Sequence, residues 1–430
     1  MRYFSTNGRS AVVGFREALL QGQPEDGGLY FPAEIPNLAE LAISPWLEGG
    51  EAETAFSLMR PYVGGEIPDA ALQAICEDAI DFPFPLVEIT PGIFALELFH
   101  GPTLAFKDVG ARFMSRCLEY FSGSIGKRAV VIVATSGDTG GAVAHGFAGV
   151  EGVSVVILFP KGRVSRVQEL QLTRTRDNVI TLEVHGSFDD CQKLAKTALS
   201  DSELRNKYFL TSANSINIAR WLPQQTYYFV ARRQLPDAKI VFSIPSGNFG
   251  NIAGGLIAQR AGLGAGSFIA ACNANNVVPK YLETGQYIPA PSKATLSNAM
   301  DVGDPSNLAR ISQLFNDDLD RIRENMATAS ISDEETAATI RKVHEEFGYT
   351  MDPHAAVGYA SLKRLKKPDH GEIGVVLATA HPVKFDSVAE ILGNYIAVPS
   401  AVAMLEERER RSTEIANSYS EMIDAIKRSL

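Results

Sequence analysis

Short apolar runs alternate with helical segments along most of the chain. Six short runs are rich in β-branched residues, and each is followed by a turn and a segment of helical periodicity. They occupy residues 129–134, 153–159, 179–184, 240–244, 268–272 and 374–378. Runs of this kind predict strands buried on both faces, and their alternation with helices predicts parallel sheets covered by helices on both sides. The pattern therefore predicts an α/β architecture.

Turns and helix signals divide the chain into four segments. Residues 1–95 hold short helical patterns between Pro- and Gly-containing turns and end in a proline-rich hinge. Ser187 with Asp190 three residues later predicts a capping box, and Asp352 before Pro353 predicts another helix start. We predict an N-terminal domain at 1–95, α/β domains at 96–230 and 231–400, and a charged helical tail at 401–430.

The densest chemical signal surrounds Lys107, in the segment ELFHGPTLAFKDVGARF that starts at Glu97. A lysine that follows Phe106 and starts a helix loses water around its ammonium group. Burial lowers the pKa of the amine and makes it available for carbonyl chemistry. A lysine whose stem is buried and whose ammonium stays in water is the alternative, and from spacing alone it is the more common case.

A glycine-rich loop, ATSGDTGGA at residues 134–142, follows the first of these apolar runs. A turn of this kind that leads into a helix exposes unpaired amides at the positive end of the helix dipole, where a carboxylate or phosphate can bind. A tight turn capped by Ser136 or Asp138 is an equally good interpretation of the loop alone.

A second loop repeats this architecture, with PSGNFGN at residues 245–251 between an apolar run and a helix rich in small residues. Gly247 and Gly250 allow the backbone to curl around a small tetrahedral anion, so we predict a phosphate ligand. The spacing matches neither the dinucleotide fingerprint nor the Walker pattern, which argues against an enzyme that uses dinucleotides or nucleoside triphosphates.

Thr379 ends the last apolar run, where ligands of α/β sheets bind. Its hydroxyl could donate one hydrogen bond to a heteroaromatic nitrogen, or it could simply bond to the backbone. His100 and His381 are candidates for lining the same pocket. No pair of histidines has metal-ligand spacing, so we predict no metal site.

Composition and charge limit the classes of molecule that the protein is expected to bind. The 430 residues carry a net charge of −10 with dispersed basic residues, which makes polynucleotide a poor ligand. We find no apolar stretch long enough for a membrane helix and no secretory signal, so we expect a cytoplasmic protein with no membrane partner. The four scattered cysteines predict reduced, mostly buried thiols.

Four motifs in order, HGPTLAFKD, ATSGDTGGA, PSGNFGN and ATAHP, resemble the tryptophan-synthase-β-like group (fold type II) of pyridoxal-phosphate enzymes. Within that group, RYFSTNG and GGLYFP near the N-terminus and NSINIARWLPQQTYYF at residues 214–229 resemble the threonine synthases of bacteria and fungi. The resemblance extends to about residue 399. It implies two parallel-sheet α/β domains around a cofactor cleft, plus an N-terminal domain.

The resemblance also implies the roles of individual residues. Lys107 would hold pyridoxal 5'-phosphate as a Schiff base and would act as the general base, Thr379 would meet the pyridine nitrogen, and Asp138 would lie near the phenolic oxygen. The cofactor phosphate would be held by Gly247, Asn248, Phe249, Gly250 and Asn251. The substrate carboxylate would lie along Ser136, Gly137, Thr139 and Gly140.

The implied substrate is O-phospho-L-homoserine, converted with water to L-threonine and phosphate by β,γ-replacement. Candidates for binding the substrate phosphate are Asn214, Ser215, Asn217 and Arg220, together with Ser5 and Thr6. Arginine suits phosphate because its guanidinium forms paired charge-assisted hydrogen bonds. Arg220 could equally be a solvated helix residue. We expect a monomer or a homodimer.

Three other functions compete with this prediction. A phospho-lyase or a serine/threonine dehydratase on the same fold would keep Lys107 and the phosphate loop but release a keto acid; the RYFSTNG segment favours the synthase. A non-catalytic ligand sensor would be expected to have lost the lysine or the glycines first. A nucleotide-binding enzyme would need the fingerprint that is absent.

Overall fold

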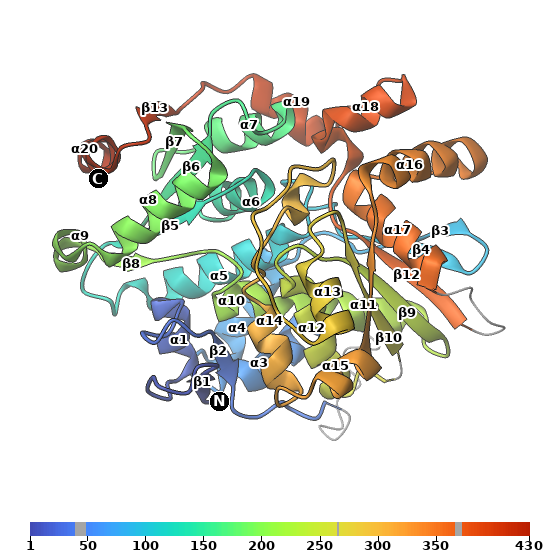
Figure 1. Cartoon of the computed structure of the whole chain (residues 1–430). Coiled ribbons are helices and arrows are strands. Elements are labelled where there is room, and N and C mark those ends of the chain that lie inside the picture. The colour runs from blue at the N-terminus through green and yellow to red at the C-terminus, as the bar shows by residue number, and fades with distance from the viewer. Residues whose placement is uncertain (39–48, 265, 366–371) are drawn as a thin grey trace.

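The protein is built from two large sheets, each flanked by helices, with a smaller N-terminal unit packed beside them (Figure 1). The computed structural model describes residues 1–38, 49–264, 266–365 and 372–430. All six predicted apolar runs are strands, and the α/β class is confirmed. Within the described residues no helix has the length and apolarity needed to cross a bilayer.

Among the described residues, the larger sheet has six strands, which are parallel throughout except where β3 runs antiparallel to β4. Val241 of β9 packs with the core of one face, whereas Ile240 and Phe242 pack with the core of the other, so the sheet is buried on both sides. In spatial order the strands are β11 (Met326–Ser330), β10 (Gly266–Cys272), β9 (Lys239–Pro245), β12 (Glu372–Ala378), β4 (Ile93–Glu97) and β3 (Leu86–Thr90).

Helices cover both faces of this sheet. One face is covered by α17, with α16 outside it, and α12 packs on the other face beside α11. The bounds are α11 (Gln225–Gln234), α12 (Gly250–Arg260), α16 (Asp333–Phe347) and α17 (Pro353–Leu365).

The second sheet, in the part of the chain that the structure describes, has five strands, all parallel. Val131 and Val133 of β5 face a core shared with α5 and α6, and Val130 and Ile132 face a core shared with α8. The strands in spatial order are β13 (Thr413–Ala416), β7 (Val179–His185), β6 (Val153–Pro160), β5 (Ala129–Ala134) and β8 (Phe209–Thr211), and the helices are α5 (Lys107–Ser122), α6 (Asp138–Gly146) and α8 (Phe188–Ser200).

The remaining elements are shorter connections and the N-terminal unit. That unit contains β1 (Tyr3–Ser5), α1 (Phe15–Gln21), β2 (Tyr30–Pro32), α3 (Glu51–Val63) and α4 (Asp69–Ala79). The connections are α7 (Arg166–Thr173), α9 (Ser202–Lys207), α10 (Ile218–Trp221), η1 (Leu222–Gln224), α13 (Val277–Thr284), η2 (Asn298–Met300), α14 (Leu308–Leu314), α15 (Leu319–Asn325), η3 (Pro382–Lys384), α18 (Asp386–Leu392), α19 (Ser400–Glu406) and α20 (Tyr419–Ser429).

The tail departs from the prediction of a helical segment at 401–430. Strand β13 lies between α19 and α20 and pairs with β7, because Ile415 is buried in the core of the five-stranded sheet while its neighbours face solvent. Strand β3 also crosses a predicted boundary, since it lies within 1–95 but joins the six-stranded sheet. The four-segment division itself stays a prediction.

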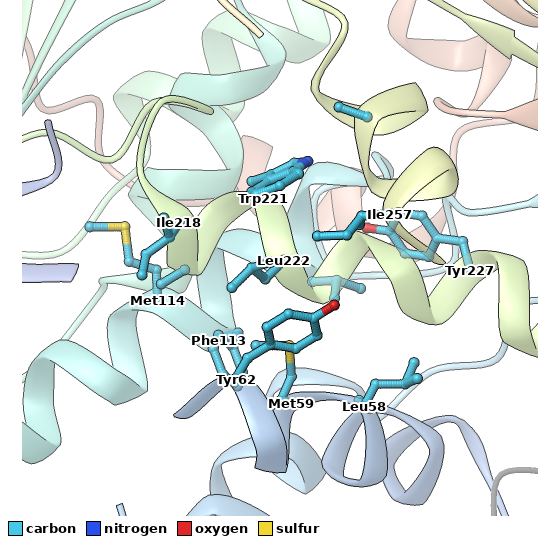
Figure 2. Close-up of a cluster of buried hydrophobic side chains, with 14 of the residues drawn as sticks. Leu58, Met59, Tyr62, Phe113, Met114, Ile218, Trp221, Leu222, Tyr227 and Ile257 are labelled. Atoms are coloured by element: carbon cyan, nitrogen blue, oxygen red, sulfur yellow. The ribbon is translucent and has the colours of Figure 1, made fainter. Parts of the chain in front are cut away.

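The N-terminal unit is anchored to the helices that carry the site. Figure 2 shows Leu58, Met59 and Tyr62 of α3 gathered with side chains of α5, α10 and α11 in one buried cluster. The Tyr62 hydroxyl donates a hydrogen bond to Gln225 at 3.3 Å. Because this cluster includes Phe113 and Trp221, it fixes the helices that bear Lys107 and Arg220 relative to each other.

Candidate active site

Lys107 is the first residue of α5 and lies at the carboxyl ends of two neighbouring parallel strands. The loop that follows β4 is tied to the end of β12, because the Phe106 amide donates to the Thr379 carbonyl at 2.9 Å and the His381 amide donates to the Leu104 carbonyl at 3.1 Å. Leu104 has a φ of +58°, an unfavourable conformation for a leucine. The loop is thus held in a strained shape that places Lys107 beside Thr379.

The Lys107 amine is largely enclosed, with 16% of its side chain exposed, and lies 3.6 Å from Asp138 Oδ2. Burial lowers the pKa of Lys107, Asp138 opposes that effect, and the positive charges of Lys384 and Arg220 add to it. The net lowering favours the neutral, nucleophilic amine expected from the sequence.

Asp138 begins α6 and is shared by two lysines. Its Oδ1 accepts hydrogen bonds from Lys384 Nζ at 2.9 Å and from Gln168 Nε2 at 3.0 Å. Burial alone would raise the pKa of Asp138, but Lys384 and then Lys107 reverse the effect and hold it well below its usual value. Asp138 is therefore a permanent carboxylate at physiological pH.

Lys384 is a residue that the sequence analysis missed. It lies in η3, five residues after Thr379, and is fully buried. Besides its bond to Asp138, its amine donates to the Thr103 carbonyl at 2.7 Å. Its position within a few residues of a predicted ligand-binding strand end was the available signal.

The loop from Gly247 to Asn251 has the features of an anion site. Within the described part of the chain, the amides of Gly247, Asn248 and Phe249 donate no hydrogen bond, and Gly250 starts helix α12. Phe249 has a φ of +59°, and a Cβ on Gly247 would lie 2.5 Å from Met300 Cα. The side-chain amide of Asn251 is buried with its nitrogen unpartnered. The close approach and the free amides fit a phosphate group.

The loop from Ser136 to Gly140 is organised differently. The amides of Gly137 and Gly140 both donate to the Thr135 hydroxyl, at 3.0 and 2.8 Å. These two glycines therefore shape the loop and have no amide left for a substrate carboxylate. The amides and hydroxyls of Ser136 and Thr139, both half-buried, are the polar groups that this loop can offer.

The segment 214–220 contacts the phosphate loop. The Ser215 hydroxyl accepts hydrogen bonds from Asn248 at 2.7 Å and from Asn307 at 3.2 Å. Asn217 instead has a structural role, because its Oδ1 caps α10 and its amide donates to the Leu19 carbonyl. That set of bonds, in a fully buried side chain, leaves Asn217 no polar atom for a ligand and corrects its assignment as a substrate residue.

Arg220 is buried, not solvated, with 4% of the residue exposed. One terminal nitrogen donates to the Ala213 carbonyl, while Nε is buried without a partner. Burial lowers the pKa of Arg220 to about 10, so the guanidinium stays charged at pH 7. A buried charge with an unused donor is the expected condition of an arginine that receives an anion.

A second buried arginine, Arg310, also escaped the sequence analysis. Its guanidinium donates to the carbonyls of Ser215 and Ile216 at 2.8 and 2.5 Å and lies 4.3 Å from the centre of the Trp221 ring. It therefore holds the 214–220 segment in place.

Four other candidates form side-chain hydrogen bonds within the protein, whereas the Thr379 hydroxyl forms none with the described residues. Ser5 bonds to Asp26 and Thr6 accepts from the Leu29 amide, so both stabilise the N-terminal turn. His100 pairs with Glu97, and His381 accepts the amide of Val383. Thr379 is buried, and its hydroxyl bonds to no protein group among the described residues. No group of three His, Cys, Asp or Glu that could hold a metal occurs in the described part of the chain.

Comparisons with known proteins agree with this geometry. Residues 83–380 match the family model described as pyridoxal-phosphate dependent enzyme. Residues 2–80 match threonine synthase N terminus, and residues 355–426 match threonine synthase, C-terminal. A threonine synthase of Escherichia coli strain K12 is 42% identical over 407 residues, covering 94% of each chain.

The chain belongs to the threonine synthase family.

Solved structures of this family have the same fold over the whole chain. The crystal structure of an Escherichia coli threonine synthase superposes with a TM-score of 0.91 at 40% identity and covers 100% of both chains. A threonine synthase from Brucella melitensis, described as bound to PLP, gives a TM-score of 0.91 at 36% identity, covering 100% of this chain and 99% of that one. Pyridoxal phosphate is thus the cofactor of this family member, and the free amides at Gly247 and the enclosed Lys107 amine fit it.

Proposed function

We propose that the chain converts O-phospho-L-homoserine and water to L-threonine and phosphate. The proposal rests on Arg220, a buried cation with an unused donor close enough to Lys107 to lower the pKa of that lysine. The substrate carries a carboxylate and a phosphate in addition to its amine. A site for it therefore needs a second anion-binding group besides the loop that receives the cofactor phosphate.

The cofactor is assigned to three sets of residues. Lys107 would hold its aldehyde carbon, the Thr379 hydroxyl would meet its ring nitrogen, and the free amides of residues 247–251 would bind its phosphate. Asp138 would lie beside the ring with its charge balanced by Lys384 and Lys107. When bound, pyridoxal phosphate supplies the electron sink that makes the C–H bonds beside the substrate amine acidic.

The substrate is assigned to groups that remain unused. Ser136 and Thr139 would receive the carboxylate, because the neighbouring glycine amides are taken by Thr135. Arg220 would receive the substrate phosphate, together with Asn214 and Ser215 from the same segment. These two groups of residues follow β5 and β8, which are neighbouring strands of the five-stranded sheet, and would hold the substrate beside Lys107.

Proton transfer falls to Lys107. Burial lowers its pKa, which favours the neutral form of the freed amine, the form that can take the α proton. Asp138 cannot serve as a general acid, because its pKa is held far below physiological pH. Its role is to hold Lys107 and Lys384 in position while the substrate phosphate leaves toward Arg220.

The test is to incubate the purified enzyme with O-phospho-L-homoserine and to quantify phosphate, threonine and 2-oxobutyrate together. Equal amounts of phosphate and threonine support the synthase. The reaction should be lost in Lys107→Ala and retained in Lys127→Ala, a control at an exposed lysine. Phosphate accompanied by 2-oxobutyrate would identify a lyase on the same scaffold, and no phosphate release would overturn the proposal.

A further inference from the structure

A second cationic site lies outside the active site, in a pocket of about 360 Å³ between α5, α6, α7 and α19. Five arginines and a histidine line it, and none of its lining residues is acidic: Arg112, Arg116, Arg174, Arg176, Arg408 and His145. We propose that this pocket binds a small anion that carries a phosphate group.

Two of the five arginines are already neutralised. Arg112 forms a paired bond to Asp81 at 2.5 and 2.9 Å, and Arg116 bonds to Asp78 at 2.6 Å. Arg174, Arg176 and Arg408 have no ion pair with any carboxylate that the structure describes. Three uncompensated guanidinium groups around one hollow repel each other, and a bound anion would remove that repulsion.

Unused hydrogen-bonding atoms point to the same ligand. Arg174 donates through one terminal nitrogen to the Arg408 carbonyl, yet its Nε is buried with no acceptor. The hydroxyl of the adjacent Thr175 is likewise buried without a partner. Buried polar atoms are almost always paired, so neighbouring orphans on a pocket wall indicate a missing partner. A phosphate group has the oxygen acceptors that such donors lack.

His145 lies where the arginine charges converge. Partial removal of its ring from water lowers its pKa, Asp108 opposes this, and Arg112, Arg408 and Arg176 lower it further. These effects favour the neutral imidazole, which has an N–H donor and adds no positive charge to the pocket.

The inner wall of the pocket is connected to the catalytic carboxylate. Thr103 lines the pocket, and its carbonyl accepts hydrogen bonds from Gln171 at 2.9 Å and from Lys384 at 2.7 Å. Lys384 in turn bonds to Asp138. A ligand in the pocket would thus lie against Thr103, whose carbonyl accepts the hydrogen bond of Lys384.

The experiment is a calorimetric titration of the holoenzyme with inorganic phosphate at constant ionic strength. Wild type should bind phosphate at the pocket, and Arg174→Gln/Arg408→Gln should weaken that binding by about tenfold or more. Arg341→Gln is the matched control, because it removes an exposed arginine of α16 that lies outside the pocket. Arg408→Lys should bind phosphate more tightly than Arg408→Gln but more weakly than wild type, since a lysine cannot form the paired contact.

Phosphate released by the reaction can also bind at the active site, so the two sites need separate variants. Binding that is lost in Arg220→Gln belongs to the active site, and binding that persists there but is lost in Arg174→Gln belongs to the pocket. An isotherm unchanged between wild type and Arg174→Gln/Arg408→Gln would overturn the proposal, whatever the outcome for the proposed reaction. Glycerol 3-phosphate binding more tightly than inorganic phosphate would identify a phosphate ester as the occupant, and equal affinity would identify free phosphate.

Discussion

The two glycine-rich loops, at 134–142 and 245–251, follow the same pattern of strand, turn and helix but offer opposite chemistry. Helix α6 begins with its own carboxylate, Asp138, and two of the loop's amides are taken by Thr135. Helix α12 has no acidic residue in its first turn, and the amides before it are free. The positive end of the first helix is thus neutralised from within, and that of the second is left for an external anion.

This difference shows what a glycine-rich loop does and does not predict. Glycine allows the backbone to curl, but an anion binds only where the chain has not already satisfied the amides and the helix dipole. The first loop presents a carboxylate to two lysines, Lys107 and Lys384. The second leaves its amides free, and we propose that a phosphate binds to them. Experiments that exchange these properties test the comparison.

The largest effect is expected from Lys384→Met. The change leaves the buried Asp138 carboxylate with the Gln168 hydrogen bond and the longer contact to Lys107, and breaking one partner of a buried pair typically costs about 3–5 kcal/mol of stability. Urea unfolding of the holoenzyme measures the loss. Lys384→Met/Asp138→Asn should recover much of it; strictly additive losses in the double variant would show that the pair is not coupled.

Lys384→Met can also be tested by a second measurement, one whose result a purely structural role of Lys384 would leave unchanged. The charge of Lys384 lowers the pKa of Lys107, so removing it should raise that pKa. Capture of pyridoxal phosphate by the cofactor-free protein requires the neutral amine, and its rate should therefore need a higher pH in Lys384→Met than in wild type. An unchanged pH profile would contradict the electrostatic link.

Gly247→Ala should weaken the second loop. A Cβ at this position would lie 2.5 Å from Met300 Cα, a backbone atom that cannot rotate away, so the loop has to shift. We expect the affinity for pyridoxal phosphate to fall by about ten- to a hundredfold, as measured by titration of the cofactor-free protein. Gly123→Ala is the control, because nothing lies within 4 Å of its Cβ position. Equal affinities in the two variants would show that the phosphate does not bind at this loop.

Patterns that are local in the chain could be predicted from the sequence. The Ser187 capping box with Asp190 is present, and Asp352 accepts the amides of His354 and Ala355 at the start of α17. The buried strands were recognisable because each carries its own apolar run. Strand β13 could not be recognised in the sequence, since only Ile415 of its four residues is buried. Its structure depends on its pairing with β7.

The other residues of the site could not be predicted, because their positions depend on contacts between segments that are distant in the sequence. Lys384 reaches Thr103 across 281 residues, and Arg310 reaches the Tyr30 carbonyl across 280. Neither has a neighbouring residue that would indicate such a partner. Asn217 was misassigned for the same reason, because the Leu19 carbonyl that occupies its amide comes from the N-terminal unit. Residue type and spacing indicated where ligands are expected to bind. They did not indicate which polar groups are already hydrogen-bonded to other parts of the protein.

The smallest effect, and the sharpest test of the comparison, is expected from Thr135→Val. Valine keeps the shape of threonine but removes the hydroxyl that accepts the amides of Gly137 and Gly140. Two buried donors then lose their acceptor, which should cost about 1–3 kcal/mol of stability, and Thr135→Ser should restore it. If the loop keeps its shape, its freed amides would resemble those of the second loop and could bind the substrate carboxylate, lowering KM while kcat stays the same. A higher KM with lower stability would instead show that the Thr135 hydroxyl holds the loop in the shape that binds substrate. A variant with the stability and KM of wild type would show that the hydrogen bonds of these amides do not account for the difference between the two loops.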